Sequence, residues 1–454
     1  MTVTARAPGR GKSGDGPGPS PSTRALVLVP APRRRRRAGE RDMPGRIAEA
    51  VGLARSIDLD IVDAFAVPVA ERRPATLFGS GKVAEIAGRV YADAVTLVVV
   101  DGALSPIQQR NLERAWKAKV IDRTGLILEI FGERARTREG RLQVELAHLN
   151  YQKSRLVRSW THLERQRGGF GFLGGPGETQ IEADRRMIEE RVQRIEKDLA
   201  AVATRRRLQR ETRKKGAQSV VALVGYTNAG KSTLFNALAD ATVFADDRLF
   251  ATLDPTLRRI SLPQSAVAVL SDTVGFVADL PTTLVAAFRA TLEEVAEAEV
   301  ILHVRDIADA DTEAQAKDVG AVLAELGIDS RDPARVIEVW NKIDLLPEAQ
   351  RPPRTIPARV NGADGAPAVV AVSALTGEGL RDLAEAIERQ IVAGRRTYTV
   401  ALAGAALAEL HRLYELGDVV ERHETDAGAT VARVRVGPER EAEFRRRFPD
   451  AAVE

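Results

Sequence analysis

Cysteine is absent from the 454 residues of this chain, histidine occurs only five times, and aromatic side chains make up 4% of it. The absence of cysteine excludes disulfide bonds, thiolate metal sites and a cysteine nucleophile. The histidines stand alone without the spacing of metal ligands, so we do not expect a structural zinc site. No apolar run approaches the roughly 18 residues that cross a bilayer, and no secretion signal follows the first basic residues. We therefore expect a cytoplasmic protein without a membrane partner.

Positive charge is concentrated in two stretches, although the net charge is only +4. Residues 33–37 are five consecutive arginines, and residues 204–215 read TRRRLQRETRKK. Such stretches suit polyanions such as nucleic acid, and a merely solvated charged surface is the alternative for each. Residues 1–22 have hardly any bulky apolar side chains, so we predict a disordered N-terminal tail.

Apolar patterning after this tail predicts several folded segments of α/β and helical class. Short strands alternate with helices in residues 23–135, which predicts a small N-terminal α/β domain. Apolar side chains at 3/4 spacing in residues 136–217 predict an antiparallel helical hairpin, or coiled coil, with its tip loop at 166–178. Residues 218–393 repeat strand and helix, which predicts a mostly parallel sheet with helices on both faces. A small C-terminal α/β domain is predicted for residues 397–454.

The glycine-rich stretch GGFGFLGGPGETQIEADRR begins at residue 168, inside the predicted hairpin. It is not a phosphate-binding loop, because no strand precedes it and no Lys-Ser/Thr pair follows its glycines. Small residues let a backbone approach RNA closely, and Arg165, Arg167, Arg185 and Arg186 flank the loop with positive charge. The alternative is that the glycines only turn the chain.

A phosphate-binding loop is predicted instead at GYTNAGKS, which fits G-x-x-x-x-G-K-[ST] and lies between an apolar strand and a helical pattern. Its backbone N–H groups and the helix N-terminus would surround the phosphates. Lys231 would neutralise the β and γ oxygens, and Ser232 would bind Mg²⁺. The predicted contacts are Gly225, Tyr226, Thr227, Asn228, Ala229, Gly230, Lys231, Ser232 and Thr233.

Two further motifs follow in the order that a GTPase requires. Thr252 in FATLDPT is a candidate for closing over Mg²⁺ and the γ-phosphate, although a threonine in a loop is often only a turn residue. Asp272 would hold Mg²⁺ through water, and Gly275 would offer its N–H to the γ-phosphate. We therefore predict Lys231, Thr252 and Gly275 as catalytic residues and Ser232 and Thr252 as metal ligands. The nucleotide contacts predicted here are Phe250, Ala251, Thr252, Leu253, Asp272, Thr273, Val274 and Gly275.

The sequence VWNKIDL favours guanine as the base. The carboxylate of Asp344 can accept two hydrogen bonds from guanine that adenine cannot donate, and an unpaired buried group costs about 1–3 kcal/mol. VSALTG fits the loop that closes over the base. The predicted base contacts are Asn341, Lys342, Ile343, Asp344, Ser373, Ala374 and Leu375.

These motifs together resemble the translation-factor-like branch of P-loop GTPases. Further stretches are similar to the HflX family of ribosome-associated GTPases over nearly the whole chain after residue 23, among them TLFGSGKVAEI, WTHLERQRGG, GPGETQIEADRR, FATLDPTLRR and DTVGFVADLP. The resemblance implies a GTPase that binds the large ribosomal subunit and dissociates or rescues ribosomes, under stress. It also implies that the loop around Gly175 to Gln180 reaches rRNA near the peptidyl-transferase region. Phe172 and Leu173 depart from the family pattern, in which the tip commonly carries a basic residue.

Phe276 follows DTVG where many GTPases place a glutamine that orients the attacking water, and the HflX family generally has a hydrophobic residue there. Intrinsic hydrolysis of GTP to GDP and phosphate should therefore be slow, near ~10⁻⁴ to 10⁻³ s⁻¹, until the ribosome completes the site. Asn228 lies where some related GTPases help to bind K⁺, so K⁺ stimulation is a further hypothesis. Nothing in the sequence requires more than a monomer.

Several alternatives are open from the sequence. The arginine-rich hairpin also fits an RNA-remodelling hydrolase that uses ATP as well as GTP, and a ribosome-assembly GTPase fits the same motifs. FGSGK at 78–82 is interpreted as a strand-to-helix turn, with nucleotide or RNA binding there as the alternative. A GTPase scaffold at a membrane or on a metalloenzyme finds no support in metal-ligand clusters or amphipathic basic helices.

Overall fold

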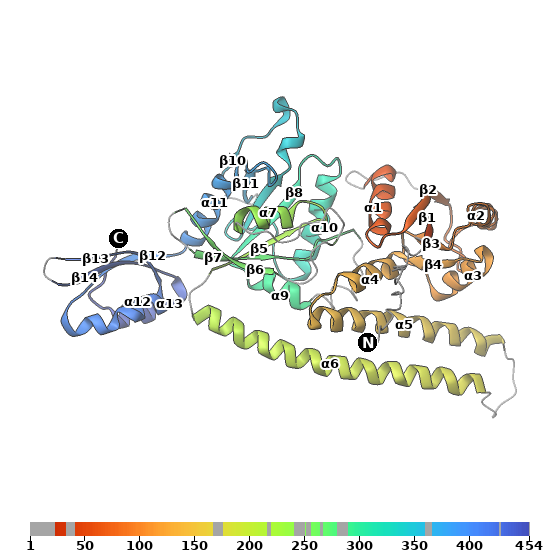
Figure 1. Ribbon diagram of the computed structural model, residues 1–454, viewed down its shortest axis with the longest axis horizontal. Helices are drawn as coiled ribbons and strands as arrows, with labels where there is room; N and C mark the ends of the chain where they lie inside the picture. Colours follow the sequence, from red (N-terminus) through yellow and green to blue (C-terminus); the bar gives the residue numbers. More distant parts are fainter. Residues whose placement is uncertain are drawn as a thin grey trace, which may run out of the picture.

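The computed structural model describes residues 23–32, 41–166, 176–215, 219–239, 250, 256–263, 267–278, 289–358, 366–425 and 428–453. An N-terminal α/β domain, a GTPase-type α/β domain and a small C-terminal domain follow one another across Figure 1, and two long helices run beneath the first two. The predicted tail (1–22), the arginine run (33–37) and Thr252 lie outside the described residues. The predicted fold class is confirmed.

The N-terminal domain is a four-stranded parallel sheet in the order β2-β1-β3-β4. Its central strand β1 buries five consecutive apolar residues, Ala25 to Val29, as expected for a parallel strand covered on both faces. Asp42 caps the start of α1, and Ser105 with Gln108 forms a capping box on α3. In chain order the elements are β1 (Arg24–Pro32), α1 (Met43–Arg55), β2 (Asp60–Val69), α2 (Ser80–Ala92), β3 (Leu97–Val100), α3 (Pro106–Trp116), β4 (Lys119–Asp122) and α4 (Arg123–Arg134).

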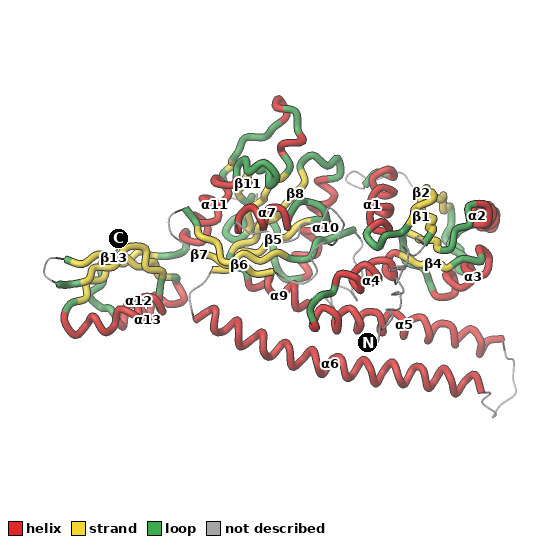
Figure 2. Tube along the Cα trace, viewed as in Figure 1, coloured by secondary structure: helices red, strands yellow, loops and turns green. Residues whose placement is uncertain are grey.

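Two long helices form the antiparallel hairpin, α5 (Arg138–Gln166) and α6 (Pro176–Lys215). The 40 residues of α6 correspond to about 60 Å at 1.5 Å per residue. Helix α5 lies between α4 and α6 (Figure 2). Its Val144 and Ala147 are buried in the core that α4 shares, and Arg191 of α6 is paired with Glu145 at 2.7 Å. The hairpin is thus attached to the N-terminal domain through the first half of α5.

The GTPase-type domain has a seven-stranded sheet in the order β10-β11-β9-β8-β5-β7-β6. The inner strands are parallel, and the two edge strands β6 and β10 are antiparallel to their neighbours. Its elements are β5 (Ser219–Gly225), α7 (Lys231–Ala239), β6 (Thr256–Ser261), β7 (Val267–Asp272), α9 (Arg289–Glu297), β8 (Val300–Asp306), α10 (Thr312–Glu325), β9 (Val336–Asn341), 3-10 turns at Ile343–Leu345 and Glu348–Gln350, β10 (Thr355–Ile356), β11 (Ala368–Ala371) and α11 (Leu380–Val392).

Helices cover both faces of this sheet. Side chains of α7 and α11 form one apolar core with the strands, and side chains of α9 and α10 form another. The second core continues into the N-terminal domain, where Phe131 of α4 meets Phe250 edge to face at 4.6 Å between ring centroids. The two domains therefore share one buried core.

The C-terminal domain has its own core around Tyr398, Phe444 and Phe448. Its antiparallel sheet has the order β13-β14-β12-β15, with two helices packed on it. The elements are β12 (Arg396–Leu402), a 3-10 turn at Gly404–Glu409, α12 (Leu410–Leu416), β13 (Asp418–Glu424), β14 (Thr430–Val436), α13 (Pro438–Arg447) and β15 (Ala452–Val453). Arg395 links this domain to the larger sheet by donating to Ser219 Oγ at 2.5 Å and pairing with Asp418.

Across the described parts of the chain, no helix combines the length and apolar character needed to cross a bilayer.

Candidate functional site

The predicted motifs meet at one edge of the large sheet. The parallel strands β5, β7 and β9 end at Gly225, Asp272 and Asn341, and parallel strands end at the same edge. The strand order reverses at β5, because β6 and β7 lie on one side of it and the later strands, beginning with β8, lie on the other. Ligands of open α/β sheets bind at such a switch point.

Two glycines of the phosphate-loop motif are required by close packing. A Cβ added to Gly225 would lie 2.2 Å from the carbonyl oxygen of Val304, and one added to Gly230 would lie 2.2 Å from Asn341 Nδ2. Gly230 also has φ +91°, and Asn228 has φ 60°, so the loop passes twice through the left-handed region. The loop can adopt this path only with glycine at positions 225 and 230.

Lys231 is the first residue of α7 and is 7% exposed. Its Nζ donates a hydrogen bond to the carbonyl oxygen of Tyr226 at 2.8 Å. Burial lowers the pKa of Lys231 to about 8, and the nearby carboxylate of Asp272 opposes this shift. A desolvated ammonium at a helix N-terminus is suited to bind phosphate oxygens.

Ser232 and Asp272 lie together beside this lysine. Ser232 Oγ donates to Asp272 Oδ2 at 2.7 Å, which brings a hydroxyl and a carboxylate oxygen to one place. Such hard oxygen donors are what Mg²⁺ prefers. The neighbouring Thr273 is fully buried, and its Oγ1 donates to the carbonyl oxygen of Leu223 at 2.5 Å, so its hydroxyl holds β7 against β5.

The segment after Asp272 is hydrogen-bonded to the phosphate loop. Phe276 N donates to Gly225 O at 3.1 Å, and Thr227 N donates to Phe276 O at 2.7 Å. A Cβ on Gly275 would lie 2.8 Å from Thr227 Cγ2 and 3.1 Å from Lys231 Nζ, so this glycine is needed for the close approach. The ring of Phe276 is 3% exposed and belongs to the shared core, where it has no means of holding water.

Asn341 connects the phosphate loop with the predicted base loops. Its Nδ2 donates to Ala229 O at 2.9 Å, and its Oδ1 accepts from Ala374 N at 3.0 Å. Lys342 has φ 66°, and its Nζ lies 2.7 Å from Asp306 Oδ2. One buried amide thus fixes the spacing between the loops that hold phosphate and base.

The predicted base-recognition residues lie around this amide. Asp344 is half-buried in the 3-10 turn Ile343–Leu345, and Ser373 is fully buried with its Oγ accepting from Thr376 N at 3.1 Å. Leu375 is 80% exposed and Leu345 is 64% exposed, so both apolar side chains border the surface at this edge.

Some of the predicted nucleotide contacts have side chains that are buried in the core between the domains, and others lie outside the residues that the structure describes. Phe250 is buried against Phe131, so its side chain belongs to the core between the domains. Val274 is likewise buried in that core. Ala251, Thr252 and Leu253 lie outside the described residues, as do residues 167–175 of the tip and the side chains of 176–181.

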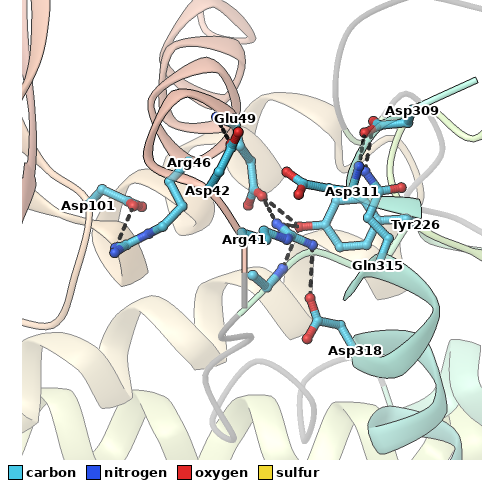
Figure 3. Close-up of polar contacts among 12 residues, drawn as sticks. Arg41, Asp42, Arg46, Glu49, Asp101, Tyr226, Asp309, Asp311, Gln315 and Asp318 are labelled. Atoms are coloured by element: carbon cyan, nitrogen blue, oxygen red, sulfur yellow. Dashed lines mark hydrogen bonds and ion pairs between the residues drawn. The ribbon is translucent and has the colours of Figure 1, made fainter. Parts of the chain in front are cut away.

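Sequence reasoning missed where the side chain of Tyr226 goes. It leaves the phosphate loop toward the N-terminal domain, where its hydroxyl contacts Arg41 and Glu49 and the Arg41 guanidinium lies 4.5 Å from the ring centroid (Figure 3). Burial, together with the charge of Glu49, raises the pKa of Tyr226, so the hydroxyl stays protonated. The only signal in the sequence was an aromatic residue in a loop whose other residues are small or polar.

Comparison with known families and proteins agrees with this geometry. Profiles described as GTP-binding GTPase N-terminal, GTP-binding GTPase Middle Region, 50S ribosome-binding GTPase and HflX C-terminal domain match residues 45–132, 134–213, 220–342 and 358–453. The chain is 50% identical over 366 residues to the GTPase HflX of Magnetococcus marinus, covering 80% of this chain and 82% of that protein. This chain belongs to the HflX family.

A second GTPase HflX and one solved structure are also similar to this chain. Identity to the GTPase HflX of Escherichia coli (strain K12) is 45% over 363 residues, covering 80% of this chain and 83% of that protein. A GTP-binding protein of Sulfolobus solfataricus, solved in complex with GDP, has a TM-score of 0.41 and 20% identity, covering 81% of this chain and 98% of that one. The predicted family, P-loop GTPase fold and GTPase activity are confirmed, and this HflX-family enzyme has a ribosome-binding GTPase domain.

Proposed function

We propose that this GTPase binds the large ribosomal subunit and uses GTP binding and hydrolysis to dissociate or rescue ribosomes under stress, as a monomer in the cytoplasm. The observation that supports this most directly is that the GTP-binding motifs lie in the domain whose core also holds α5, the first arm of a long helical hairpin. We also propose these domain boundaries: the tail is 1–22, the N-terminal domain 23–135, the hairpin 136–217, the GTPase domain 218–393 and the C-terminal domain 397–454.

The chain's own residues suffice for binding GTP. Lys231 Nζ would bind the β and γ oxygens, Gly275 N–H the γ-phosphate, and Asp344 the N1–H and amine of guanine. The hydroxyl of Ser232, with Asp272 beside it at 2.7 Å, fits Mg²⁺, and Thr252 would supply a second hydroxyl. Mg²⁺ bound there would neutralise charge on the phosphates.

Slow intrinsic hydrolysis follows from Phe276. Its ring is buried and has no hydrogen-bonding group, so it cannot orient water, and the unassisted rate should lie near ~10⁻⁴ to 10⁻³ s⁻¹. We propose that the ribosome completes the site and accelerates hydrolysis. We also propose that Asn228 contributes to a K⁺ site, so that exchanging K⁺ for Na⁺ lowers the stimulated rate.

The glycine-rich tip is the proposed contact with rRNA near the peptidyl-transferase region. The decisive experiment measures GTP turnover with and without large ribosomal subunits, for the natural chain and for a variant in which residues 168–178 are replaced by a short Gly/Ser turn. Strong stimulation that the variant loses, while its GDP affinity stays unchanged, supports the proposal. Fast turnover without ribosomes would show that Phe276 has been misinterpreted.

A second measurement separates ribosome dissociation from assembly. Light scattering of intact ribosomes should fall when the protein and GTP are added, and should not fall with GDP. An unchanged signal, combined with tight binding to immature large subunits, would favour the assembly GTPase instead.

A further inference from the structure

Ala278, three positions after Gly275, is held through both of its backbone polar groups. Its N–H donates to Tyr226 Oη at 2.7 Å, and its carbonyl oxygen accepts from Arg123 Nη2 at 2.9 Å. Arg123 belongs to the N-terminal domain, so this domain directly restrains the segment that follows the predicted γ-phosphate contact.

The hydroxyl of Tyr226 makes three hydrogen bonds. It accepts from Ala278 N and from Arg41 Nη1 at 2.6 Å, and it donates to Glu49 Oε2 at 2.8 Å. A phenolic hydroxyl has one proton and two acceptor positions, so all three are occupied. Figure 3 shows Arg41 and Glu49 converging on this tyrosine from the N-terminal domain, with Asp318 of α10 beyond them at 2.8 Å from Arg41.

Arg123 is the first residue of α4 and is 7% exposed, paired with Asp101 and Glu49 as well as with Ala278. A buried guanidinium with two carboxylate partners has one favourable position, because any shift leaves a buried charge without its partner. Ala278 therefore cannot move independently of the start of α4.

The residue before it, Asp122, continues the network into the hairpin. Asp122 caps α4 by accepting from Gly125 N at 2.9 Å, and it also accepts from Tyr151 Oη and Arg155 Nη2, both at 2.7 Å. Tyr151 and Arg155 lie on α5, with the Arg155 guanidinium 4.1 Å from the tyrosine ring centroid. Asp122 and Arg123 are consecutive, so a displacement at one is a displacement at the other.

We propose that Arg123 and Asp122 are positioning residues that transmit the nucleotide state from Ala278 to α5, the first arm of the hairpin. GTP would draw Gly275 toward the γ-phosphate, Ala278 would move with it, and its buried hydrogen bonds would carry the displacement to the corner between β4 and α4. The inference rests on the proposed function in using the γ-phosphate contact of Gly275. Coupling of this kind needs an element that both sites bias, and that element is this corner.

Amide hydrogen exchange tests the route without ribosomes. In the natural full-length chain, peptides covering residues 146–156 should exchange at rates that differ several-fold between GDP and a non-hydrolysable GTP analogue. Asp122→Asn keeps the oxygen that caps α4 and accepts from Tyr151, but it places an amide NH2, which cannot accept, where Oδ2 accepts from Arg155 Nη2 and Leu104 N. This variant should lose the difference while GDP affinity stays unchanged. Tyr151→Phe, which removes one hydroxyl, should reduce the difference in exchange between the two nucleotides. It is the alternative test if Asp122→Asn does not fold.

Glu145→Gln provides the matched control. Glu145 also lies on α5, but its partner is Arg191 of α6, which is off the route. The control should keep the nucleotide-dependent exchange. Identical exchange with both nucleotides in the natural chain, or an undiminished difference in Asp122→Asn and Tyr151→Phe, overturns the inference.

Affinity for the large subunit distinguishes this inference from the proposed function. The ratio of affinities with the GTP analogue and with GDP should be roughly 5 to 150 in the natural chain, the usual range of allosteric coupling, and should approach one in Asp122→Asn. A natural chain with nucleotide-dependent exchange in α5 but no such ratio would contradict the proposed function alone. A ratio retained in Asp122→Asn would contradict the positioning role alone.

Discussion

The chemistry of Lys231 depends strongly on its surroundings, because burial lowers its pKa to about 8, although the nearby carboxylate of Asp272 acts to raise it. Phosphate binding needs the protonated form. GDP affinity should therefore be nearly constant below about pH 7.5 and fall about tenfold between about pH 7 and pH 9. Fluorescence titration with a labelled GDP measures this, and an affinity that is flat over that range would contradict it.

The lowered pKa of Lys231 makes the stability of the fold rise with pH, whereas it makes nucleotide affinity fall. The folded pKa of Lys231 lies below its ordinary value of 10.5, so the unfolded chain binds more protons between these two values. The free energy of unfolding of the nucleotide-free protein should thus gain a contribution that rises with pH through that window. Urea unfolding at several pH values should show this rise, and Lys231→Met should remove it.

Asp344→Asn should change the base that is bound. The amide can accept only one of the two guanine hydrogen bonds, and an unpaired group costs about 1–3 kcal/mol, so GTP affinity should fall by roughly 5- to 150-fold. Xanthosine triphosphate, which carries a carbonyl where guanine has its amine, should bind better to the variant than to the natural chain. Competition titration with GTP, ATP and xanthosine triphosphate checks this, and unchanged GTP affinity would rule out Asp344 as the base contact.

Gly230→Ala should disable the phosphate loop. The substitution puts a side chain at φ +91° and 2.2 Å from Asn341 Nδ2, so the contact between Asn341 and Ala229 must break. We expect a loss of about 1–2 kcal/mol from the backbone alone and loss of GDP binding. Gly132→Ala in α4 meets no atom within 4 Å and is the control. It should stabilise the protein by about 0.5–1 kcal/mol and leave GDP binding unchanged.

At the scale of elements, helix α3 shows how a local signal stabilises one piece of the fold. Its start, at Pro106, is preceded by the capping box in which Ser105 and Gln108 each satisfy the other's backbone N–H, at 3.2 and 2.8 Å. Ser105→Ala should lower the free energy of unfolding by about 1 kcal/mol. Urea unfolding measures it, with the exposed Ser154→Ala on α5 as a control that should change it by less than about 0.5 kcal/mol.

Some elements were predictable from the sequence and others were not. The mostly apolar stretches at 219–225 and 300–304 predicted the buried strands β5 and β8, because inner parallel strands are largely apolar on both faces. The edge strands β6 and β10 were not predicted, because β6 carries Arg258 and Arg259 at exposed positions and β10 has only two residues. The 3/4 spacing predicted α5, but not that Val144 and Ala147 give it a second apolar face toward α4.

At the scale of the whole molecule, the N-terminal and GTPase-type domains should unfold together. Phe131 is fully buried and reaches Phe250 across the boundary, within a core that belongs to both domains. Phe131→Ala should cost about 3–5 kcal/mol and separate this unfolding into two calorimetric transitions. Phe444→Ala, in the separate C-terminal core, should lower the transition of that domain only. A single unchanged transition in Phe131→Ala would contradict a shared core.

The sequence by itself determined the local chemistry of this protein. The phosphate loop, the aspartate at the end of β7 and the NKID stretch are short motifs whose function follows from residue type and spacing, so they identified a GTPase, and further stretches such as GPGETQIEADRR pointed to its family. Only the tertiary structure decided how the GTP site is connected to the rest. Arg41 and Tyr226 are 185 positions apart, and Arg123 and Ala278 are 155 apart. Such contacts leave no periodic trace in the sequence, because they form only when segments far apart in the chain pack around one shared core.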